Sequence, residues 1–453
     1  MACPTFKAGC EPLILGTGEA YPENTYSQQE FLQALLERYP MDEASAAFAR
    51  RIFPATGITA GSSALPRDQL FKRMTRSEFV NYIRETTEDM SRRAAQQALA
   101  AWGGDLSSIT HIVFGTMSAV IDAPTTDSRL INSMGLRTDI RRLSVQQMGC
   151  LTGFRCLSTA AELAAANPAA RILVIVADVR SGLQNQLPHW EGNDSSAGPS
   201  RACIISCALF RDAASAVVIG AGARAGEVPL AKVLRSASAF LPGTLDYVHI
   251  TDGDDATISW FNSKDLPNAV SAAAPDMVAH LLKGVKGASI SHTAFAMHPG
   301  GPKILQLTAK ALGLTDDAFA TSWEFLQQHG NTSGSSNLAL LHRELMREGS
   351  AASPRTRDIM CVGIGPGLAL EGLLLRRVTP SLKQQLLHFE HGFELVARQL
   401  ANVQQAWHRS RGSSSSGSSR RAGLRRSRSS SRSSSWVVAR LALDTVDSNR
   451  NSS

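Results

Sequence analysis

Short, wholly apolar runs alternate along this chain with longer stretches rich in alanine and leucine, a pattern that favours an α/β protein. Residues 109–117 and 171–179 read as buried strands, and residues 154–168 between them read as an alanine-rich helix. The same reasoning predicts strands at the end of 208–222 and over 292–298, 358–365 and 368–378, and helices over 302–313 and 337–349. We therefore expect β-sheets whose faces are covered by helices.

Two of the expected strands resemble each other. THIVFGTM (110–117) and SHTAFAMH (291–298) both begin at a Thr/Ser-His pair and run into a polar loop. Two similar halves, 1–225 and 226–378, would bring the two loops to one junction, where ligands tend to bind. A chance similarity between two short strands is the alternative.

The last part of the chain differs in composition. Residues 379–408 have apolar positions near helical spacing and predict an appended amphipathic helix. Residues 409–453 are rich in serine and arginine, cannot bury a core and are expected to be disordered. The eight arginines between 409 and 432 exceed the net charge of +7, so the rest of the chain is close to neutral. Because the chain outside the tail has no excess of positive charge, and the tail has no set of aromatic residues on which bases could stack, a nucleic-acid partner is disfavoured.

Several features favour a cytoplasmic protein. No run approaches the roughly 20 apolar residues that span a bilayer, and the first residues make a poor secretory signal. The seven cysteines are odd in number and contain no CxxC pair. Neither a disulfide framework nor a metal site is expected, and reduced thiols fit better.

Three polar segments stand out as candidates for chemistry. Cys150 lies in SVQQMGCLTGF at the start of a predicted helix, where unpaired N–H groups favour a thiolate. His298 ends a strand in AMHPGGPKIL, and Asn331 lies in the loop HGNTSGSSNLALL. Taken singly, each has a structural explanation: a buried thiol, a histidine satisfied in a turn, and a helix-capping asparagine.

Together, and in this order, the motifs QQMGC, HPGGP, GNTSG and GIGPG closely resemble those of the type III polyketide synthases, the chalcone and stilbene synthase family. The resemblance covers about residues 10–378, and other features suggest a fungal or microbial member. It implies a thiolase fold: two pseudo-duplicated α/β halves in a five-layer αβαβα core, working as a homodimer. Residues 379–453 lie outside the resemblance.

The resemblance implies a malonyl-CoA-dependent acyltransferase in which Cys150, His298 and Asn331 are the catalytic residues. Cys150 would carry the acyl group of an acyl-CoA starter, with His298 as its imidazolium partner. Asn331 and His298 would stabilise the enolate formed when malonyl-CoA loses CO₂. The CoA thioesters are substrates, and no cofactor or metal is expected.

The resemblance also suggests which residues bind the substrates. Those matched to the acyl pocket are Phe210, Trp260, Met117, Leu183 and Ser333, and those proposed to contact CoA are Arg50, Arg51, Gly301 and Lys303. Met117 and Leu183 stand where chalcone synthases have threonine. The resulting apolar pocket favours a fatty acyl starter and alkylpyrone, alkylresorcinol or resorcylic acid products.

Three residues depart from the family pattern, because Phe154, Arg211 and Ala213 stand where glycine is usual. They keep open a catalytically degenerate thiolase-fold binding protein. A second alternative is a ketoacyl synthase of the fatty-acid type that performs a single condensation. Its histidine usually lies in an HQAN-like turn, so the HPGGP sequence around His298 disfavours it.

Overall fold

The computed structural model describes residues 6, 10–39, 41–186, 201–252, 257–347 and 356–378. The predicted helix over 379–408 and the predicted disordered tail over 409–453 lie outside the described residues. Within them, every strand and helix expected above is present. These elements are β4 (His111–Thr116), α5 (Thr152–Ala166), β6 (Arg171–Asp178), β7 (Ala213–Ala221), β11 (Thr293–Met297), α9 (Pro302–Ala311), α11 (Ser335–Met346), β12 (Asp358–Gly365) and β13 (Ala369–Arg377).

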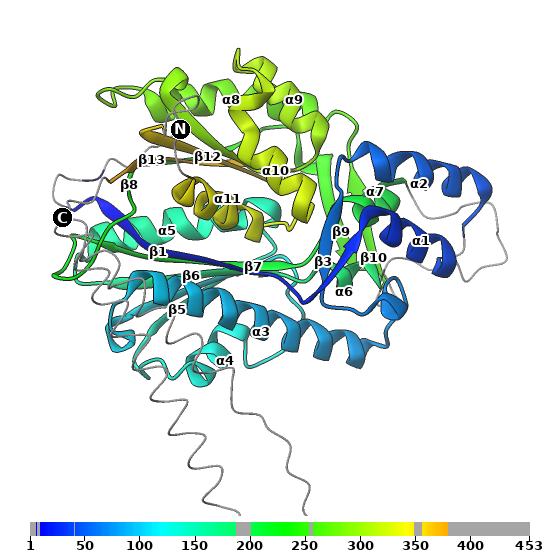
Figure 1. Ribbon diagram of the computed structural model, residues 1–453, viewed down its shortest axis with the longest axis horizontal. Coiled ribbons are helices and arrows are strands. Elements are labelled where there is room, and N and C mark those ends of the chain that lie inside the picture. The colour runs from blue at the N-terminus through cyan, green and yellow to red at the C-terminus, as the bar shows by residue number, and fades with distance from the viewer. Residues whose placement is uncertain are drawn as a thin grey trace, which may run out of the picture. The chain divides into compact units, whose positions relative to one another are not determined.

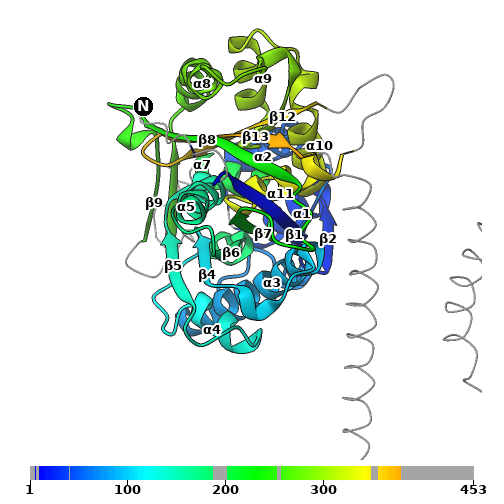
Figure 2. The same cartoon turned by 90° about the vertical axis from the view of Figure 1, so that its left-hand side faces the viewer.

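The elements form the five layers that the resemblance implies (Figure 1). One strand system contains β1 (Pro12–Ala20), β7, β6, β4 and β5 (Arg141–Gln146), and the other contains β8 (Ala231–Phe240), β13, β12 and β11. The outer layers are α3 (Arg76–Trp102) with α4 (Thr126–Ser133), and α8 (Leu266–Leu282) with α9. Helix α10 (Ala320–His329) packs against β11 and α11. Helices α5 and α11 lie between the two strand systems (Figure 2).

The two strand systems have matching topology. Strand β4 is parallel to β6, which is antiparallel to β7, while β11 is parallel to β12, which is antiparallel to β13. Helix α3 precedes β4 as α8 precedes β11, and α5 precedes β6 as α11 precedes β12. The similar segments 110–117 and 291–298 are therefore equivalent strands of a duplicated fold.

The pairing of β1 with β8, Leu13 with Lys232 and Ile14 with Ala231, joins the two strand systems into one nine-stranded sheet. The expected division near residue 225 falls in the connection between β7 and β8.

The central helices pack unusually closely. A Cβ atom on Gly153 of α5 would lie 2.3 Å from the carbonyl oxygen of Gly334 and 2.8 Å from Cβ of Asn337 in α11. Because a sheet covers each side of this layer, α5 is apolar around most of its circumference and buries Phe154, Leu157 and Ala161. The close approach brings the N-termini of both helices to the same place.

The core accommodates the residues that replace glycine. The ring of Phe154 is fully buried and fits beside Gly363, where an added Cβ would lie 3.2 Å from Cδ2 of the ring. Arg211 is also buried, and its guanidinium donates to the carbonyl oxygens of Cys207 and Phe210 at 2.9 and 2.5 Å. Ala213 is buried in β7.

The remaining elements lie around this core. They are β2 (Asn24–Ser27), α1 (Gln28–Arg38), α2 (Glu43–Ala55), β3 (Ala60–Ser63), α6 (Arg180–Gln184), α7 (Arg201–Leu209), β9 (Val248–Asp252) and β10 (Ile258–Asn262). In the part of the chain that the structure describes, no helix combines the length and apolarity needed to cross a membrane.

Candidate active site

Cys150 lies in a tight turn between β5 and α5, at the helix start where the sequence placed it. Gln147 and Gly149 both have positive φ angles, +59° and +65°, and a single 3₁₀ turn over Gly149–Leu151 leads into α5. A Cβ atom on Gly149 would lie 2.0 Å from Cδ of Pro366. The QQMGC and GIGPG motifs are therefore packed directly against each other, which explains why glycine is needed at 149.

His298 continues the line of β11, and its backbone N–H donates to the carbonyl oxygen of Val362 in β12 at 2.9 Å. Gly301 (φ +144°) and Pro302 then begin α9. The HPGGP sequence therefore turns the chain sharply away from the sheet while leaving the imidazole at the sheet edge.

Asn331 comes from the loop before α11 and pairs with Phe210 in an isolated parallel bridge between the two halves. Its N–H donates to the carbonyl oxygen of Leu209 at 2.8 Å, and its carbonyl accepts from the N–H of Arg211 at 3.0 Å. Its side-chain Oδ1 accepts from the N–H of Ser333 at 2.8 Å. With Oδ1 engaged, the amide NH₂ group remains as a donor.

The structure brings the three predicted catalytic residues to one cavity. Cys150, His298 and Asn331 line the same cavity of about 80 Å³. The Sγ atom of Cys150 lies 3.7 Å from Oγ of Ser333. The Nε2 atom of His298 is buried and has no hydrogen-bond partner among the described residues. Substrate atoms entering this cavity would meet a thiol, an imidazole nitrogen and an amide.

Asn337, which sequence analysis passed over, connects two of these residues. Its Nδ2 donates to the carbonyl oxygen of Cys150 at 2.7 Å, and its Oδ1 lies 3.1 Å from Nδ1 of His298. Because Nδ2 is the donor of the amide, Oδ1 is the acceptor and Nδ1 of His298 carries the proton. In the neutral imidazole, Nε2 is then free to accept a proton. The feature that could have identified Asn337 is a polar residue in the part of α11, residues 335–341, in which every residue is buried.

Burial controls the protonation of the pair. It raises the pKa of the Cys150 thiol to about 11, against the opposing effects of the Arg180 charge and of hydrogen bonds from Ser333 and Asn331. It lowers the pKa of the His298 imidazole to about 4, against the hydrogen bond to Asn337. Both shifts favour a thiol and a neutral imidazole in the substrate-free chain, because loss of hydration opposes each charged form, whereas the helix start by itself favours a thiolate.

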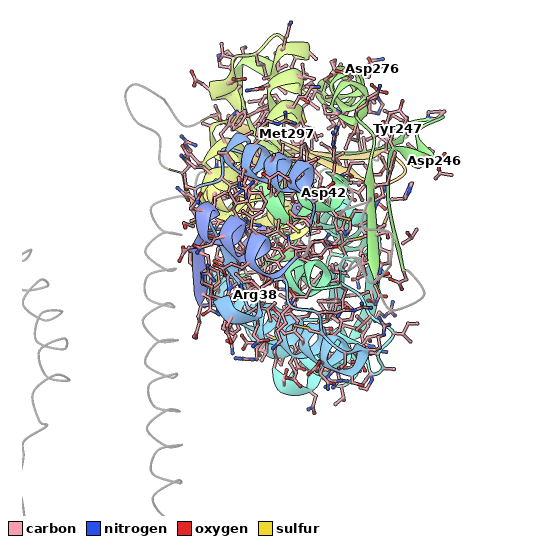
Figure 3. All side chains as sticks on the ribbon, turned by 90° about the vertical axis from the view of Figure 1, so that its right-hand side faces the viewer. Arg38, Asp42, Asp246, Tyr247, Asp276 and Met297 are labelled. Atoms are coloured by element: carbon pink, nitrogen blue, oxygen red, sulfur yellow. The ribbon has the colours of Figure 1, made fainter. Side chains whose placement is uncertain are left out.

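A larger cavity of about 770 Å³ adjoins the small one. Both are lined by Met117, Arg180, Val248, Ile250 and Pro366. The two-stranded β9–β10 ribbon forms part of their wall. In Figure 3, the labelled Asp246 and Tyr247 stand at one end of this ribbon, and Met297 marks the end of β11 just before His298.

All five predicted pocket residues line these cavities. Phe210, Trp260 and Ser333 line the small one, Leu183 lines the larger one, and Met117 lines both. The Phe210 and Trp260 ring centroids are 4.8 Å apart. Arg180 is a lining residue that sequence analysis missed. The feature that could have identified Arg180 is a charged residue two positions after the end of the wholly buried strand β6.

The four residues proposed to contact CoA line neither cavity. Arg50 and Arg51 are exposed on α2, where Arg50 forms an ion pair with Glu43 at 3.0 Å. Lys303 is exposed in the first turn of α9, and Gly301 precedes it. Their role toward CoA stays a prediction. The described residues contain no group of three or more His, Cys, Asp or Glu side chains arranged to hold a metal ion.

Comparison with known proteins agrees with this geometry. The chain is 28% identical over 387 residues to "Probable polyketide synthase 1" of Dictyostelium discoideum, covering 83% of this chain but only 12% of that protein. It is 27% identical over 385 residues to "Type III polyketide synthase A" of Arabidopsis thaliana, covering 81% of this chain and 93% of that one. It is also 27% identical over 390 residues to "Bisdemethoxycurcumin synthase" of Oryza sativa subsp. japonica, covering 80% and 91%.

Solved structures show the same fold. The C-terminal type III polyketide synthase domain of Steely1, a type I/III hybrid from Dictyostelium, superposes with a TM-score of 0.71 at 26% identity and covers 82% of this chain and 100% of that one. The fungal type III polyketide synthase ORAS gives a TM-score of 0.72 at 24% identity, covering 81% and 100%, and supports the fold alone.

The models of the N-terminal and C-terminal domains of chalcone and stilbene synthases match residues 64–223 and 232–379. These matches span well over half of the chain and include all four motifs. The chain belongs to the chalcone and stilbene synthase family, the type III polyketide synthases, which are malonyl-CoA-dependent condensing acyltransferases.

Proposed function

We propose that the chain performs repeated decarboxylative condensation of malonyl-CoA onto an acyl-CoA starter held on Cys150. The observation that supports this most is the convergence of Cys150, His298 and Asn331, from three distant segments, on one cavity. A nucleophile, a proton acceptor and an amide donor are the groups that acyl transfer and enolate formation require.

Loading begins with the neutral pair. The Sγ atom of Cys150 attacks the thioester carbonyl of the starter, and its proton passes to Nε2 of His298 as the S–C bond forms. The C–S bond to CoA then breaks, the CoA thiolate leaves and is protonated by solvent, and Nε2 of His298 keeps the proton that it accepted from Cys150. Asn337 holds Nδ1 of His298, so that Nε2 faces the cavity in the form that can accept the proton.

In the extension step, Asn331 and His298 donate hydrogen bonds to the thioester oxygen of malonyl-CoA. When malonyl-CoA loses CO₂, negative charge develops on its thioester oxygen, and the amide of Asn331 with the N–H of protonated His298 stabilises the enolate. The enolate carbon attacks the Cys150 thioester, so that a C–C bond forms and the thiolate of Cys150 is released. The thiolate of Cys150 then attacks the thioester carbonyl of the β-ketoacyl-CoA, the C–S bond to CoA breaks, and the CoA thiolate leaves, so that the lengthened chain is on Cys150 for the next round.

For substrate and product, the proposal is a fatty acyl starter and alkylpyrone, alkylresorcinol or resorcylic acid products. Met117, Leu183, Val248 and Ile250 support it as apolar residues in the lining of the larger cavity, which also contains the charged residues Arg76, Asp246 and Asp252. A volume of about 770 Å³ is within the range of pockets that hold a whole small molecule.

We further propose a cytoplasmic homodimer. The edge strand β5 is largely exposed, and Ile121, Leu143 and Met148 near it are exposed apolar side chains. The six described cysteines are all free thiols, which fits a reducing compartment. Sedimentation velocity tests the dimer, because a monomeric mass at micromolar concentration contradicts it.

The deciding experiment is incubation of the full chain with ¹³C-labelled malonyl-CoA and acyl-CoAs of increasing length, with products identified by mass spectrometry. Triketide or longer products that vanish in Cys150→Ala but persist in Cys10→Ala support the proposal. Diketides alone would favour a single-round ketoacyl synthase. Malonyl-CoA left intact by a folded dimer would favour a catalytically degenerate binding protein.

A further inference from the structure

The Arg180 side chain is buried beside the reactive cysteine without a hydrogen-bond partner. It is 1% exposed, and its Nε, Nη1 and Nη2 atoms make no hydrogen bond with any described residue. A guanidinium carries five N–H donors, and leaving such a group unpaired in the interior is costly. A ligand with acceptor oxygens would remove that cost.

Two aromatic rings hold the guanidinium in place. Its central carbon lies 4.6 Å from the centroid of the Phe210 ring and 4.5 Å from that of Trp260. Cation–π contacts stabilise the charge through the faces of the rings but use none of the N–H donors. No described residue accepts from these N–H groups, and Arg180 lines both cavities.

The neighbouring carboxylates are already engaged. Asp178 accepts from the N–H groups of Met117 at 2.6 Å and Gly334 at 2.8 Å. Asp212 accepts from the N–H groups of Ser181 at 2.8 Å and Ala64 at 2.9 Å. Among the described residues, neither carboxylate forms an ion pair or a hydrogen bond with the Arg180 guanidinium, although Asp212 also accepts from the backbone N–H of Arg180. Both aspartates stabilise the Arg180 charge through space, but they leave its side-chain N–H donors without a hydrogen-bond partner.

We propose that Arg180 forms an anion subsite of the acyl cavity, which binds a pair of negatively charged oxygens on the acyl group carried by Cys150. A guanidinium presents two parallel N–H donors, which fit a carboxylate at the end of the starter. They equally fit the enolate of a 1,3-dicarbonyl in the growing chain. This inference rests on the proposed function, because it assigns a partner for the acyl chain within the same cavity.

The carboxylate of malonyl-CoA is a poor ligand for this subsite. That carboxylate loses its charge as CO₂ forms, so pairing it with a buried cation would stabilise the ground state more than the transition state. The subsite is therefore suited to oxygens that are retained through the reaction.

The test compares two starters of equal length, glutaryl-CoA and pentanoyl-CoA, with the full chain. Acylation of Cys150 is followed by intact mass, and products formed with malonyl-CoA are followed by chromatography and mass spectrometry. Arg180→Met keeps the length and apolar stem of the side chain, and Arg180→Lys keeps the charge without the fork. Arg137→Met is the matched control, because Arg137 is a surface residue paired with Asp139.

Two results support the subsite and identify its ligand. In the first, the wild-type protein loads glutaryl-CoA about 10- to 100-fold faster than pentanoyl-CoA, and this preference is lost in Arg180→Met and partly kept in Arg180→Lys. The ligand of Arg180 is then the carboxylate of the starter. In the second, both starters load equally, but the Arg180→Met protein stops after the first condensation. The ligand of Arg180 is then the enolate of the growing chain. Should Arg180→Met fail to fold, the same two comparisons are made with Arg180→Lys, which predicts a smaller change in the same direction.

Two other results overturn the inference. One is an Arg180→Met protein with wild-type starter preference and product length. The other is an Arg180→Met protein whose rates fall equally for every starter, while the pH dependence of Cys150 alkylation shifts to higher pH. Arg180 would then act only by lowering the pKa of the Cys150 thiol. If wild-type Cys150 is acylated but no C–C bond forms, the proposed function fails, while the loading comparison still measures the subsite.

Discussion

The imidazole of His298 is fixed by Asn337, whose Oδ1 lies 3.1 Å from Nδ1 of the ring. The other end of the same amide donates to the carbonyl oxygen of Cys150 at 2.7 Å. One buried side chain therefore sets the tautomer of His298 and its position relative to the backbone of Cys150. Asn337 acts through His298 and is a positioning residue.

Replacing Asn337 by the near-isosteric leucine should lower kcat about 10- to 100-fold with a smaller change in KM, because the tautomer and orientation of His298 are no longer fixed. Asn337→Asp should move the acidic limb of the kcat profile to higher pH, because a carboxylate beside the ring favours imidazolium. Exposed Asn268→Leu is the control. An unchanged pH profile in Asn337→Asp would show that the contact is only structural.

Alkylation of Cys150 by iodoacetamide should keep accelerating as the pH rises past 9, because burial raises the pKa of this thiol to about 11. Peptide mass spectrometry measures the rate at each pH, with the partly exposed Cys10 in the same sample as the internal reference. A rate that levels off below pH 8 contradicts the dominance of burial and favours the thiolate expected from the helix start.

The free energy of unfolding should fall as the pH drops from about 6.5 toward 4, in part because of His298. Its pKa in the folded chain is about 4, below the ordinary value, so the unfolded chain binds a proton that the folded chain does not. His298→Gln should reduce the slope in this window by up to about 1.4 kcal/mol per pH unit. Urea unfolding at several pH values measures it. An unchanged slope, equal to that of exposed His292→Gln, would contradict the assignment.

Gly149 and Gly135 make a matched pair for the turn at Cys150. Both have positive φ, +65° and +66°, but an added Cβ would collide with Pro366 only at position 149. Gly135→Ala should cost about 1–2 kcal/mol through backbone strain alone. Gly149→Ala should cost about 1–3 kcal/mol more and reduce condensation, because the GIGPG turn must move. Equal losses in urea unfolding would mean that the two motifs are not tightly packed.

Apolar patterning in the sequence by itself predicted nine of the strands and helices, whereas the duplicated architecture and the residues of the candidate site were implied by the resemblance of its motifs to a known family. Apolar runs such as 171–179 leave few choices of local structure, and the similar segments 110–117 and 291–298 proved to be equivalent strands, β4 and β11. The order of the four motifs identified Cys150, His298 and Asn331, which the fold then brought to one cavity.

Only the tertiary structure decided how this site is charged and what surrounds it. Burial depends on every element packed around a group, so the raised pKa of Cys150 and the lowered pKa of His298 could not follow from a helix start or a turn. Asn337 and Arg180 looked like ordinary polar residues at the ends of apolar runs. Their contacts come from segments far apart in the chain, and such contacts exist only once both halves of the fold are assembled.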